Sequence, residues 1–219
     1  MAKKTLHIIV ADRMEIEIIS QSGFAKVKVE DSKIRKYYFL EKGDVTLILV
    51  WSKIGLTNAA MTAQDMISRY NPKIIYNYGA VGSIRKEDLG KIFIISEASY
   101  GDVETPWYPL GQIPGESRNY PLFHNFRRSL PKARIASLNS FVSEFERAMY
   151  ISQILTTTLF DMETAAIAQV ALANKTAFTS VKAVSDVIDL NKKVSNEQIN
   201  ANIKQAAELA FPALLKIAI

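Results

Sequence analysis

The chain has 219 residues, with 27 lysines and arginines against 22 aspartates and glutamates, and its formal net charge is +5 at pH 7. It contains no cysteine and only two histidines, His7 and His124. Disulfides, thiolate metal sites and cysteine nucleophiles are therefore excluded, and a histidine-rich metal site is not expected. We expect no metal ion and no cofactor.

The positive charge could attract polyanions, but acidic residues are interleaved with the basic ones, as over residues 26–44. A solvated surface is the better interpretation, and we predict no nucleic-acid partner. No run of about 18 apolar residues occurs, so no membrane span is predicted. Residues 1–11 lack a small-residue cleavage site and favour a first strand over a signal peptide. We expect a cytoplasmic protein.

Strand and helix patterns alternate from the first residues onward. Residues 5–11 form a nearly continuous apolar run, which is typical of a strand covered on both faces, and residues 14–21 have a helical pattern. Lys42-Gly43-Asp44 indicates a hairpin within residues 33–52. A helix over 55–70 that stops at Asn71-Pro72, and then strands over 73–83 and 91–100, complete the first half.

Residues 101–133 are rich in proline, glycine and asparagine and have no clear periodicity, which predicts a long loop that could form a wall of a binding site. Beyond it the patterns alternate again. They predict strands over 133–140, 156–160 and 177–187 and helices over 143–154, 163–174 and 195–219, the last kinked or restarted near Pro212. The alternation predicts one α/β domain over residues 1–219, with a mixed, mostly parallel central sheet flanked by helices.

In open α/β sheets, ligands bind beyond the carboxyl ends of the strands, and acidic residues follow three of the predicted strands. They are Asp12 with Glu15 and Glu17, Asp161 with Glu163, and Asp186. Glu163 shares a helical stripe with Ala166, Ile167 and Val170, where a carboxylate without a partner is costly.

Each of these residues also has a purely structural interpretation. Asp161 could cap the following helix, Glu163 could complement its dipole, and Asp186 could cap whatever follows the last strand. Gly79 and Gly82 do not have the spacing of a dinucleotide-binding fingerprint. A ligand site is favoured because these acidic residues lie together at the ends of predicted strands.

Four stretches in order resemble one family, the 5′-methylthioadenosine/S-adenosylhomocysteine nucleosidases of the purine nucleoside phosphorylase superfamily. The stretches are IIVADRMEIEII, SKIGLTNAAMTAQDMI with IIYNYGAVGS, GQIPG, and FDMETAAIAQV with SVKAVSDVID. The last is the most specific, because it combines a strand, Asp-Met-Glu, a helix of small residues and a strand that ends in Ser-Asp. The resemblance implies a nucleoside phosphorylase-like fold and hydrolysis of an N-glycosidic bond, without a cofactor.

The resemblance assigns expected roles to matching positions. Glu17 matches the carboxylate that activates the hydrolytic water, and Asp186 matches the acid that protonates N7 of the leaving adenine. Glu163 matches the ligand of the ribose hydroxyls. The other matching positions contact the nucleoside: Met162 beneath the sugar, Phe141 stacked on the purine, Val142 at its edge, and Gly82, Ala80 and Ser185 nearby. For the 5′ substituent we expect Met14, Ile54, Tyr108 and Pro114 to line the pocket.

Some positions depart from the family pattern. Ala80 replaces a serine or threonine, Ser83 a glycine and Lys182 an arginine, while Asn196 is nearest to an expected aromatic residue. These differences leave the preferred 5′ substituent open.

The chemistry agrees with these residue types. Cleavage of an N-glycosidic bond needs an acid for the leaving purine and a base for water, around an oxocarbenium-like transition state. Burial of Asp186 would raise its pKa and keep it protonated. The alternatives are a phosphorylase, which would need an anion site of arginine and backbone amides, and a nucleoside-binding protein without catalysis. The resemblance also implies a homodimer that acts in methionine salvage.

Overall fold

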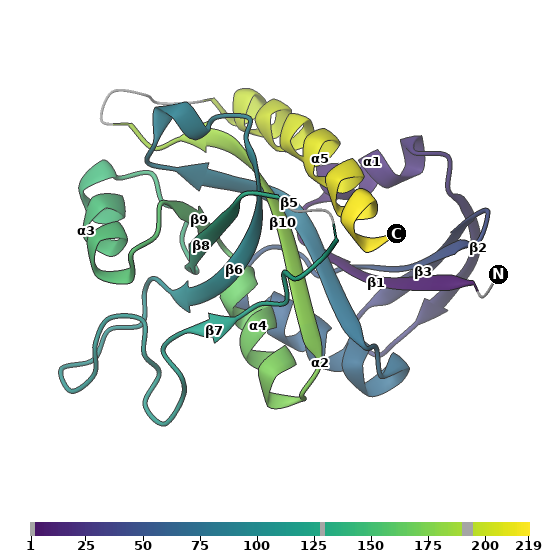
Figure 1. The fold of residues 1–219 in the computed structure, drawn as a ribbon, viewed down its shortest axis with the longest axis horizontal. Helices are drawn as coiled ribbons and strands as arrows, with labels where there is room; N and C mark the ends of the chain where they lie inside the picture. The colour runs from purple at the N-terminus through teal and green to yellow at the C-terminus, as the bar shows by residue number, and fades with distance from the viewer. Residues whose placement is uncertain (1–2, 128–129, 190–194) are drawn as a thin grey trace.

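The computed structural model describes residues 3–127, 130–189 and 195–219, and in these residues ten strands form one mixed sheet (Figure 1). Its order is β10-β6-β8-β9-β5-β1-β4-β3-β2, with β7 beside β6. The strands are β1 Lys4–Val10, β2 Ala25–Asp31, β3 Lys36–Lys42, β4 Val45–Trp51, β5 Ile74–Ser83, β6 Ile92–Tyr100, β7 Tyr120–Pro121, β8 Lys132–Ser137, β9 Leu159–Asp161 and β10 Ala177–Val187.

The centre of the sheet is parallel, as the alternation predicts: β1 pairs with β4 and β5, and β5 pairs with β10. The β2–β3–β4 meander and the β10–β6 and β5–β9 pairs are antiparallel. Because β10 also pairs with β5, strands β10, β6, β8, β9 and β5 close into a small barrel-like ring. That ring brings the carboxyl ends of β8, β9 and β10 close to those of β1 and β5.

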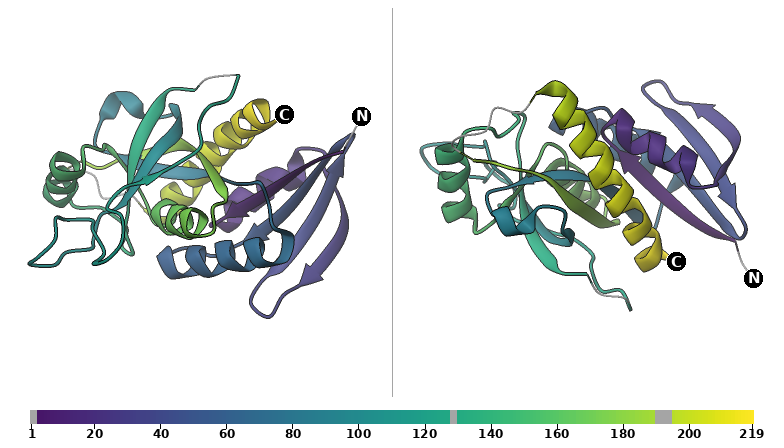
Figure 2. Two further views of the ribbon diagram at one scale, coloured as in Figure 1. Left: turned by 60° about the horizontal axis from the view of Figure 1, so that its bottom comes forward. Right: turned by 90° about the horizontal axis from the view of Figure 1, so that it is seen from above.

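Helices cover both faces of the sheet (Figure 2). The helices are α1 Arg13–Gln21, α2 Leu56–Tyr70, α3 Phe145–Leu155, α4 Thr164–Ala173 and α5 Asn196–Ala218. On one face α5 packs against β5, β10 and α1, and it buries Ala207, Phe211 and Leu214. On the other face α2 packs beside α4. Each face encloses its own apolar core, so the sheet is buried on both sides.

Several predicted boundaries hold because local chemistry sets them. Gly43, at a φ of 55°, turns the chain between β3 and β4, and Asn71, at a φ of 42°, ends α2 in the left-handed conformation. The last helix, predicted to be kinked or restarted near Pro212, runs as one element from Asn196 to Ala218 and so does not restart there. Pro212 lies on its exposed side, where water can bond to the carbonyl group that the proline leaves without a donor.

Two strand predictions differ from the structure. The strand expected over 156–160 begins only at Leu159, because Thr156 takes a φ of 53° at the end of α3. Strand β2 was not predicted: its alternating valines, Val27 and Val29, are 54% and 42% exposed, so no buried apolar stripe marks it.

Candidate active site

The first acid of the site is Glu15, in the first turn of α1. Its carboxylate accepts hydrogen bonds from the backbone amides of Ala11 and Asp12, each at 3.0 Å, and from that of Ala80 at 3.3 Å. Asp12 in turn caps the helix through the amide of Met14 at 2.8 Å, which completes a capping box. The Glu15 side chain is therefore fixed between the end of β1 and the end of β5, and it is 5% exposed.

Gly79 makes room for that carboxylate. A Cβ atom at this position would lie 2.0 Å from Oε1 of Glu15, closer than any real contact. Only glycine therefore allows β5 to pass beside the acid, although the backbone of Gly79 has an ordinary strand conformation.

Glu17, the residue expected to activate water, is not part of this group. Its side chain is exposed, whereas Glu15 on the same helix is buried. Residues two apart on a helix are turned by about 200° relative to each other, so only one of the two glutamates can face the sheet. The structure thus places Glu15, and not Glu17, among the buried acids of the site. The pattern Asp12-x-x-Glu15 is the sequence signal of a capping box and could have identified it.

Lys182 lies at the centre of the acids. It is 2% exposed, and its Nζ lies 3.0 Å from Oδ2 of Asp161, whose side chain is equally buried. Asp161 also accepts three further hydrogen bonds. The donors are the Ser137 hydroxyl at 2.5 Å, the Thr164 hydroxyl, and the Thr164 backbone amide at 3.2 Å. The predicted cap of α4 by Asp161 is therefore present, and the same carboxylate forms a buried ion pair.

Glu163 is the next acid, at the junction of β9 and α4. Its Oε1 accepts from the Gly55 amide at 3.0 Å and its Oε2 from the Met162 amide at 3.3 Å. The side chain is 6% exposed and does not cap its own helix. The strand-to-helix junction thus holds a second glutamate near Lys182, and we refer to Glu15, Asp161, Glu163 and Lys182 as the buried charge cluster.

The buried charge cluster contains three carboxyl groups and one ammonium group, and its pKa values reflect that imbalance. Burial raises the pKa of Glu15, and the charge of Lys182 and the amide donors only partly offset it. Burial, followed by the charge of Asp161, raises the pKa of Glu163. For Lys182, burial lowers the pKa, but the charges of Asp161, Glu163 and Glu15 outweigh this and the net pKa is raised.

Asp186 is the second-last residue of β10 and lies beside the cluster. Its Oδ1 accepts a hydrogen bond from the Ser185 hydroxyl at 2.5 Å, and a Cβ atom on Gly82 would lie 3.1 Å from its Oδ2. Burial raises the pKa of Asp186, against the lowering effect of the Ser185 hydrogen bond. A register shift between Val184 and Asp186 marks a bulge in β10 at this point. Such bulges re-aim side chains next to functional sites.

One small cavity joins Asp186 to the cluster, because Asp161 lines it too. Its other lining residues are Gly82, Ser140, Phe141, Val142, Phe160, Met162 and Ile188. Its volume is about 30 Å³, close to that of one water, and Phe141 at its rim is 55% exposed. The hydroxyl of Ser140 is buried without a partner in the described structure, which leaves one polar atom available to a ligand. The structure therefore brings together Asp186, Gly82, Phe141, Val142 and Met162 of the predicted site.

The other predicted contacts are distributed differently. Ser185 donates to Asp186, and the Ala80 amide donates to Glu15, while Ser83 is buried and accepts from the Arg85 amide at 3.1 Å. Met14 and Ile54 lie next in sequence to Glu15 and Gly55. Tyr108 and Pro114 are exposed on the loop between β6 and β7, and neither lines the cavity of Asp186.

In the described part of the chain, no three His, Cys, Asp or Glu side chains are placed so that they could hold one metal ion, and no helix is long and apolar enough to cross a membrane. The side chain of Asn196 lies outside what the structure describes.

The fold and these acids define an α/β protein with an acid-lined site at the carboxyl ends of its strands. The sequence model of the phosphorylase superfamily matches residues 5–218, and the chain belongs to that superfamily. A 5′-methylthioadenosine/S-adenosylhomocysteine nucleosidase of Listeria monocytogenes is 28% identical over 239 aligned positions, which cover 97% of this chain and all of the relative.

Solved structures share the fold. The nucleosidase of Neisseria meningitidis in complex with methylthio-immucillin-A is 24% identical, with a TM-score of 0.86 and 98% of both chains covered. The futalosine hydrolase of Helicobacter pylori is 20% identical, with a TM-score of 0.87, and the match covers 98% of this chain and 97% of that one. At these identities the likeness establishes the fold alone.

Proposed function

We propose that the protein hydrolyses the N-glycosidic bond of 5′-methylthioadenosine, S-adenosylhomocysteine or both, and releases adenine and the thioribose. The observation that carries the proposal is the surplus of buried carboxyl groups in the charge cluster beside a fourth acid, Asp186. Buried carboxylates without matching cations are costly, and a positively charged sugar in the transition state would offset that cost. The relatives' names supply the substrate class.

Asp186 is the proposed acid. As the C1′–N9 bond breaks, negative charge develops on the purine, and a proton delivered to N7 neutralises it. The raised pKa of Asp186 supports this role, since the group must carry its proton when substrate is bound. Ser185 orients the carboxyl group.

Glu15 replaces Glu17 as the proposed base. It would hold a water molecule and accept a proton as the water oxygen bonds to C1′. The amides of Ala11, Asp12 and Ala80 and the charge of Lys182 all favour its ionised form, which offsets part of the cost of burial. Proton transfers of this kind contribute about 10²–10⁴-fold each.

Glu163 is the proposed acceptor for the ribose diol, because hydrogen bonds to a carboxylate contribute about 1.5–3 kcal/mol. Met162 and Phe141 would pack on the sugar and the purine, with Val142, Gly82 and the Ser140 hydroxyl around the base. A purine is much larger than this cavity, but Asp186 and Ser185 also line a cavity of about 780 Å³ beside α5. A purine stacked on Phe141 would displace this exposed ring or the loop that carries it.

The same geometry disfavours a phosphorylase. Phosphate needs free backbone amides or cationic side chains. Here the Glu15 carboxylate occupies the amides at the end of β1 and at Ala80, and Lys182 is paired with Asp161. A phosphate at this point would meet buried carboxylates, so water is the better nucleophile.

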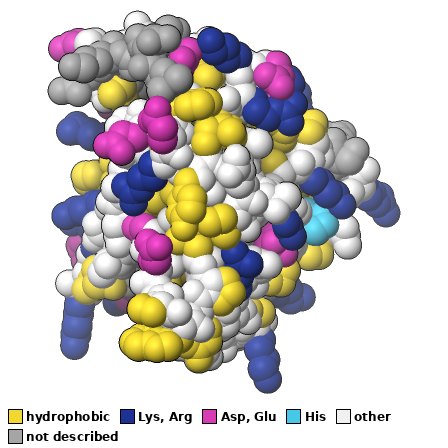
Figure 3. Space-filling model, turned by 90° about the vertical axis from the view of Figure 1, so that its left-hand side faces the viewer, with side chains coloured by type: hydrophobic (Ala, Val, Ile, Leu, Met, Phe, Trp, Pro, Cys, Tyr) yellow, Lys and Arg dark blue, Asp and Glu magenta, His cyan; other side chains and the backbone are white. Residues whose placement is uncertain are grey.

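Methionine salvage in the cytoplasm is the proposed setting, because methylthioadenosine carries the methylthio group that such a route recovers. We also propose a homodimer. Trp107 is 82% exposed and Tyr108 40% exposed on the loop between β6 and β7, and a partner could cover them and share the 5′ pocket. Figure 3 shows hydrophobic side chains on the left-hand face of Figure 1, at its centre and lower edge.

The test is adenine release from 5′-methylthioadenosine in phosphate-free buffer. We expect turnover without phosphate, with no stimulation when phosphate is added. Adenine release that requires phosphate would support the phosphorylase instead, and ligand binding with no release would support a nucleoside-binding protein.

A further inference from the structure

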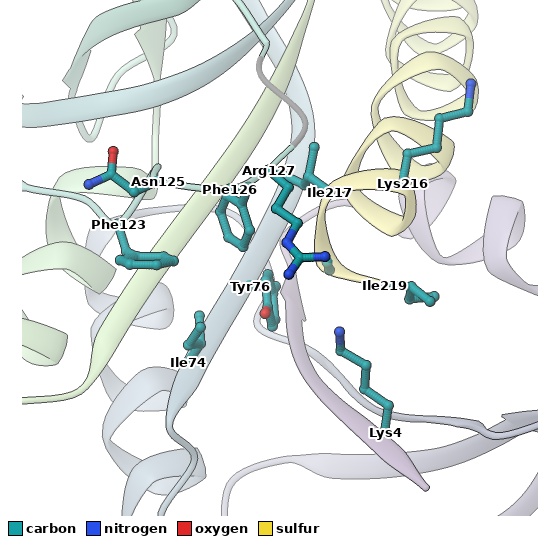
Figure 4. Close-up of a pocket in the computed structure, with 11 residues that line it drawn as sticks. Lys4, Ile74, Tyr76, Phe123, Asn125, Phe126, Arg127, Lys216, Ile217 and Ile219 are labelled. Carbon is teal, nitrogen blue, oxygen red and sulfur yellow. The ribbon is translucent and has the colours of Figure 1, made fainter. Parts of the chain in front are cut away.

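A separate cavity lies at the opposite end of the strands from the acids (Figure 4). It has a volume of about 650 Å³, within the range of small-molecule sites. Lys4 and Ile74, the first residues of β1 and β5, form one side, and Ile217 near the end of α5 forms another. Phe123 and Phe126, which pack edge to face with centroids 5.1 Å apart, add an aromatic wall.

The charged side chains among the described lining residues are all cationic, and the last residue, Ile219, also lines the cavity. Lys4, Arg127 and Lys216 line it, and no aspartate or glutamate side chain is among its described lining residues. Figure 4 shows the Arg127 guanidinium and the Lys4 ammonium directed toward the same part of the cavity, beside the ring of Tyr76, whereas Lys216 is directed elsewhere. Within the described chain, no side-chain carboxylate forms an ion pair with Lys4 or Arg127.

Tyr76 supplies the observation that points to a ligand. Its residue is 5% exposed in the middle of the sheet, yet its hydroxyl makes no hydrogen bond to any described residue and the side chain lines the cavity. The hydroxyl is not among the fully buried polar atoms of the described residues, so it is open to the cavity and to a ligand there. Burial raises the pKa of Tyr76, so the group stays protonated and remains a hydrogen-bond donor.

We propose that this cavity binds a small anion with a flat apolar body, such as an aryl carboxylate or an aryl phosphate. The anionic group would accept from Tyr76 and from the Arg127 guanidinium, which matches a planar or tetrahedral oxyanion, with Lys4 adding charge. The apolar body would pack against Phe123, Phe126 and Ile74. The site lies at the opposite end of β5 from the acids and shares no lining residue with the cavity of Asp186, so it is separate from the proposed hydrolysis.

The test uses three probes of one shape: 1-naphthoate, 1-naphthyl phosphate and the neutral 1-naphthamide. Binding is measured by calorimetry to the full chain with adenine in excess, so that the acid-lined site is occupied. We expect one or both anions to bind with a dissociation constant of about 1 mM or tighter, and the amide at least about tenfold more weakly. The relative affinity of the two anions distinguishes a carboxylate ligand from a phosphate ligand.

Two variants locate the binding. Arg127→Gln should weaken the preferred anion about tenfold or more, and Tyr76→Phe, which keeps the ring, should weaken it several-fold. Lys26→Gln, an exposed cation on β2, is the matched control and should bind like the parent chain. The proposal is overturned if neither anion binds at about 10 mM, if the amide binds equally well, or if the two variants bind like the control.

Discussion

The two ends of the central strands carry opposite charge and different degrees of enclosure. At the carboxyl ends, Glu15, Asp161 and Glu163 are buried around Lys182, and each carboxylate accepts hydrogen bonds from backbone amides. At the amino ends, Lys4 and Arg127 border an open cavity, and neither is held by an ion pair among the described side chains. The comparison teaches that the fold fixes the acids at the carboxyl ends through buried hydrogen bonds, whereas Lys4 and Arg127 at the amino ends are not fixed by ion pairs with described side chains.

The largest expected effect comes from separating the two glutamates of α1. Glu15→Gln removes the proposed base and should reduce kcat for adenine release by about 10²–10⁴-fold. Glu17→Gln, two residues away on the exposed side, is the matched control and should retain parental activity. Steady-state kinetics on both variants shows which glutamate is the base. Loss of activity in Glu17→Gln with normal activity in Glu15→Gln would assign the role to Glu17.

The next largest effect is expected from the ion pair between Lys182 and Asp161 at the centre of the buried charge cluster. Lys182→Met leaves Asp161 buried without its cation, and we expect the free energy of unfolding to fall by about 3–5 kcal/mol in denaturant titrations. The double variant Lys182→Met with Asp161→Asn should lose less than the sum of the single losses. Additive losses would mean that the two groups do not interact.

The space at Gly79 tests how rigidly the acid is held. Gly79→Ala would place a methyl group 2.0 Å from Oε1 of Glu15, so the carboxylate or β5 must move. We expect kcat to fall about tenfold or more while the protein still folds, because misplacement of a catalytic group by about 1 Å is costly. Gly43→Ala is the control. It strains a turn that has a φ of 55° outside the site, so it should lower stability and leave kcat unchanged. Unchanged kcat in Gly79→Ala would show that the position of Glu15 is not critical.

A smaller effect is expected from His7 in β1. Burial lowers the pKa of His7 to about 4, below its ordinary value of 6.5. The unfolded chain therefore binds more protons than the native state between these values, and stability should decrease as the pH falls from about 6.5 to 4. Since the ring is only partly buried, we expect a contribution on the order of 1 kcal/mol. His7→Gln should flatten this part of the profile of unfolding free energy against pH, and an unchanged profile would contradict it.

Much of the fold could be predicted because its signals are local. A nearly continuous apolar run marked β1, and the Lys42–Asp44 turn and the Asn71-Pro72 pair marked boundaries that the structure confirms. Strand β2 and the closure of the ring through the β5–β10 pair could not be predicted, because an exposed edge strand has no buried stripe and ring closure depends on pairings between distant segments.

The site could be predicted in part for the same reason. Asp186, Glu163 and Phe141 belong to sequence patterns that directly follow strands, so their neighbourhood followed from the topology. The choice between Glu15 and Glu17 depends on which side of a short helix faces the sheet, and both fit the family pattern loosely. The pair Lys182–Asp161 and the unpartnered Ser140 hydroxyl depend on tertiary packing, for which the sequence offers no spacing signal.

The central claim is that Asp186 protonates the leaving purine while the other acids hold the sugar and the water. Asp186→Asn keeps the shape of the side chain and removes its acidic proton, and one sample can be assayed for both binding and release of 5′-methylthioadenosine. We expect calorimetric binding within about tenfold of the parent chain and adenine release lower by about 10²–10⁴-fold. Release at the parental rate would contradict the assignment of Asp186 and, with it, the proposed mechanism.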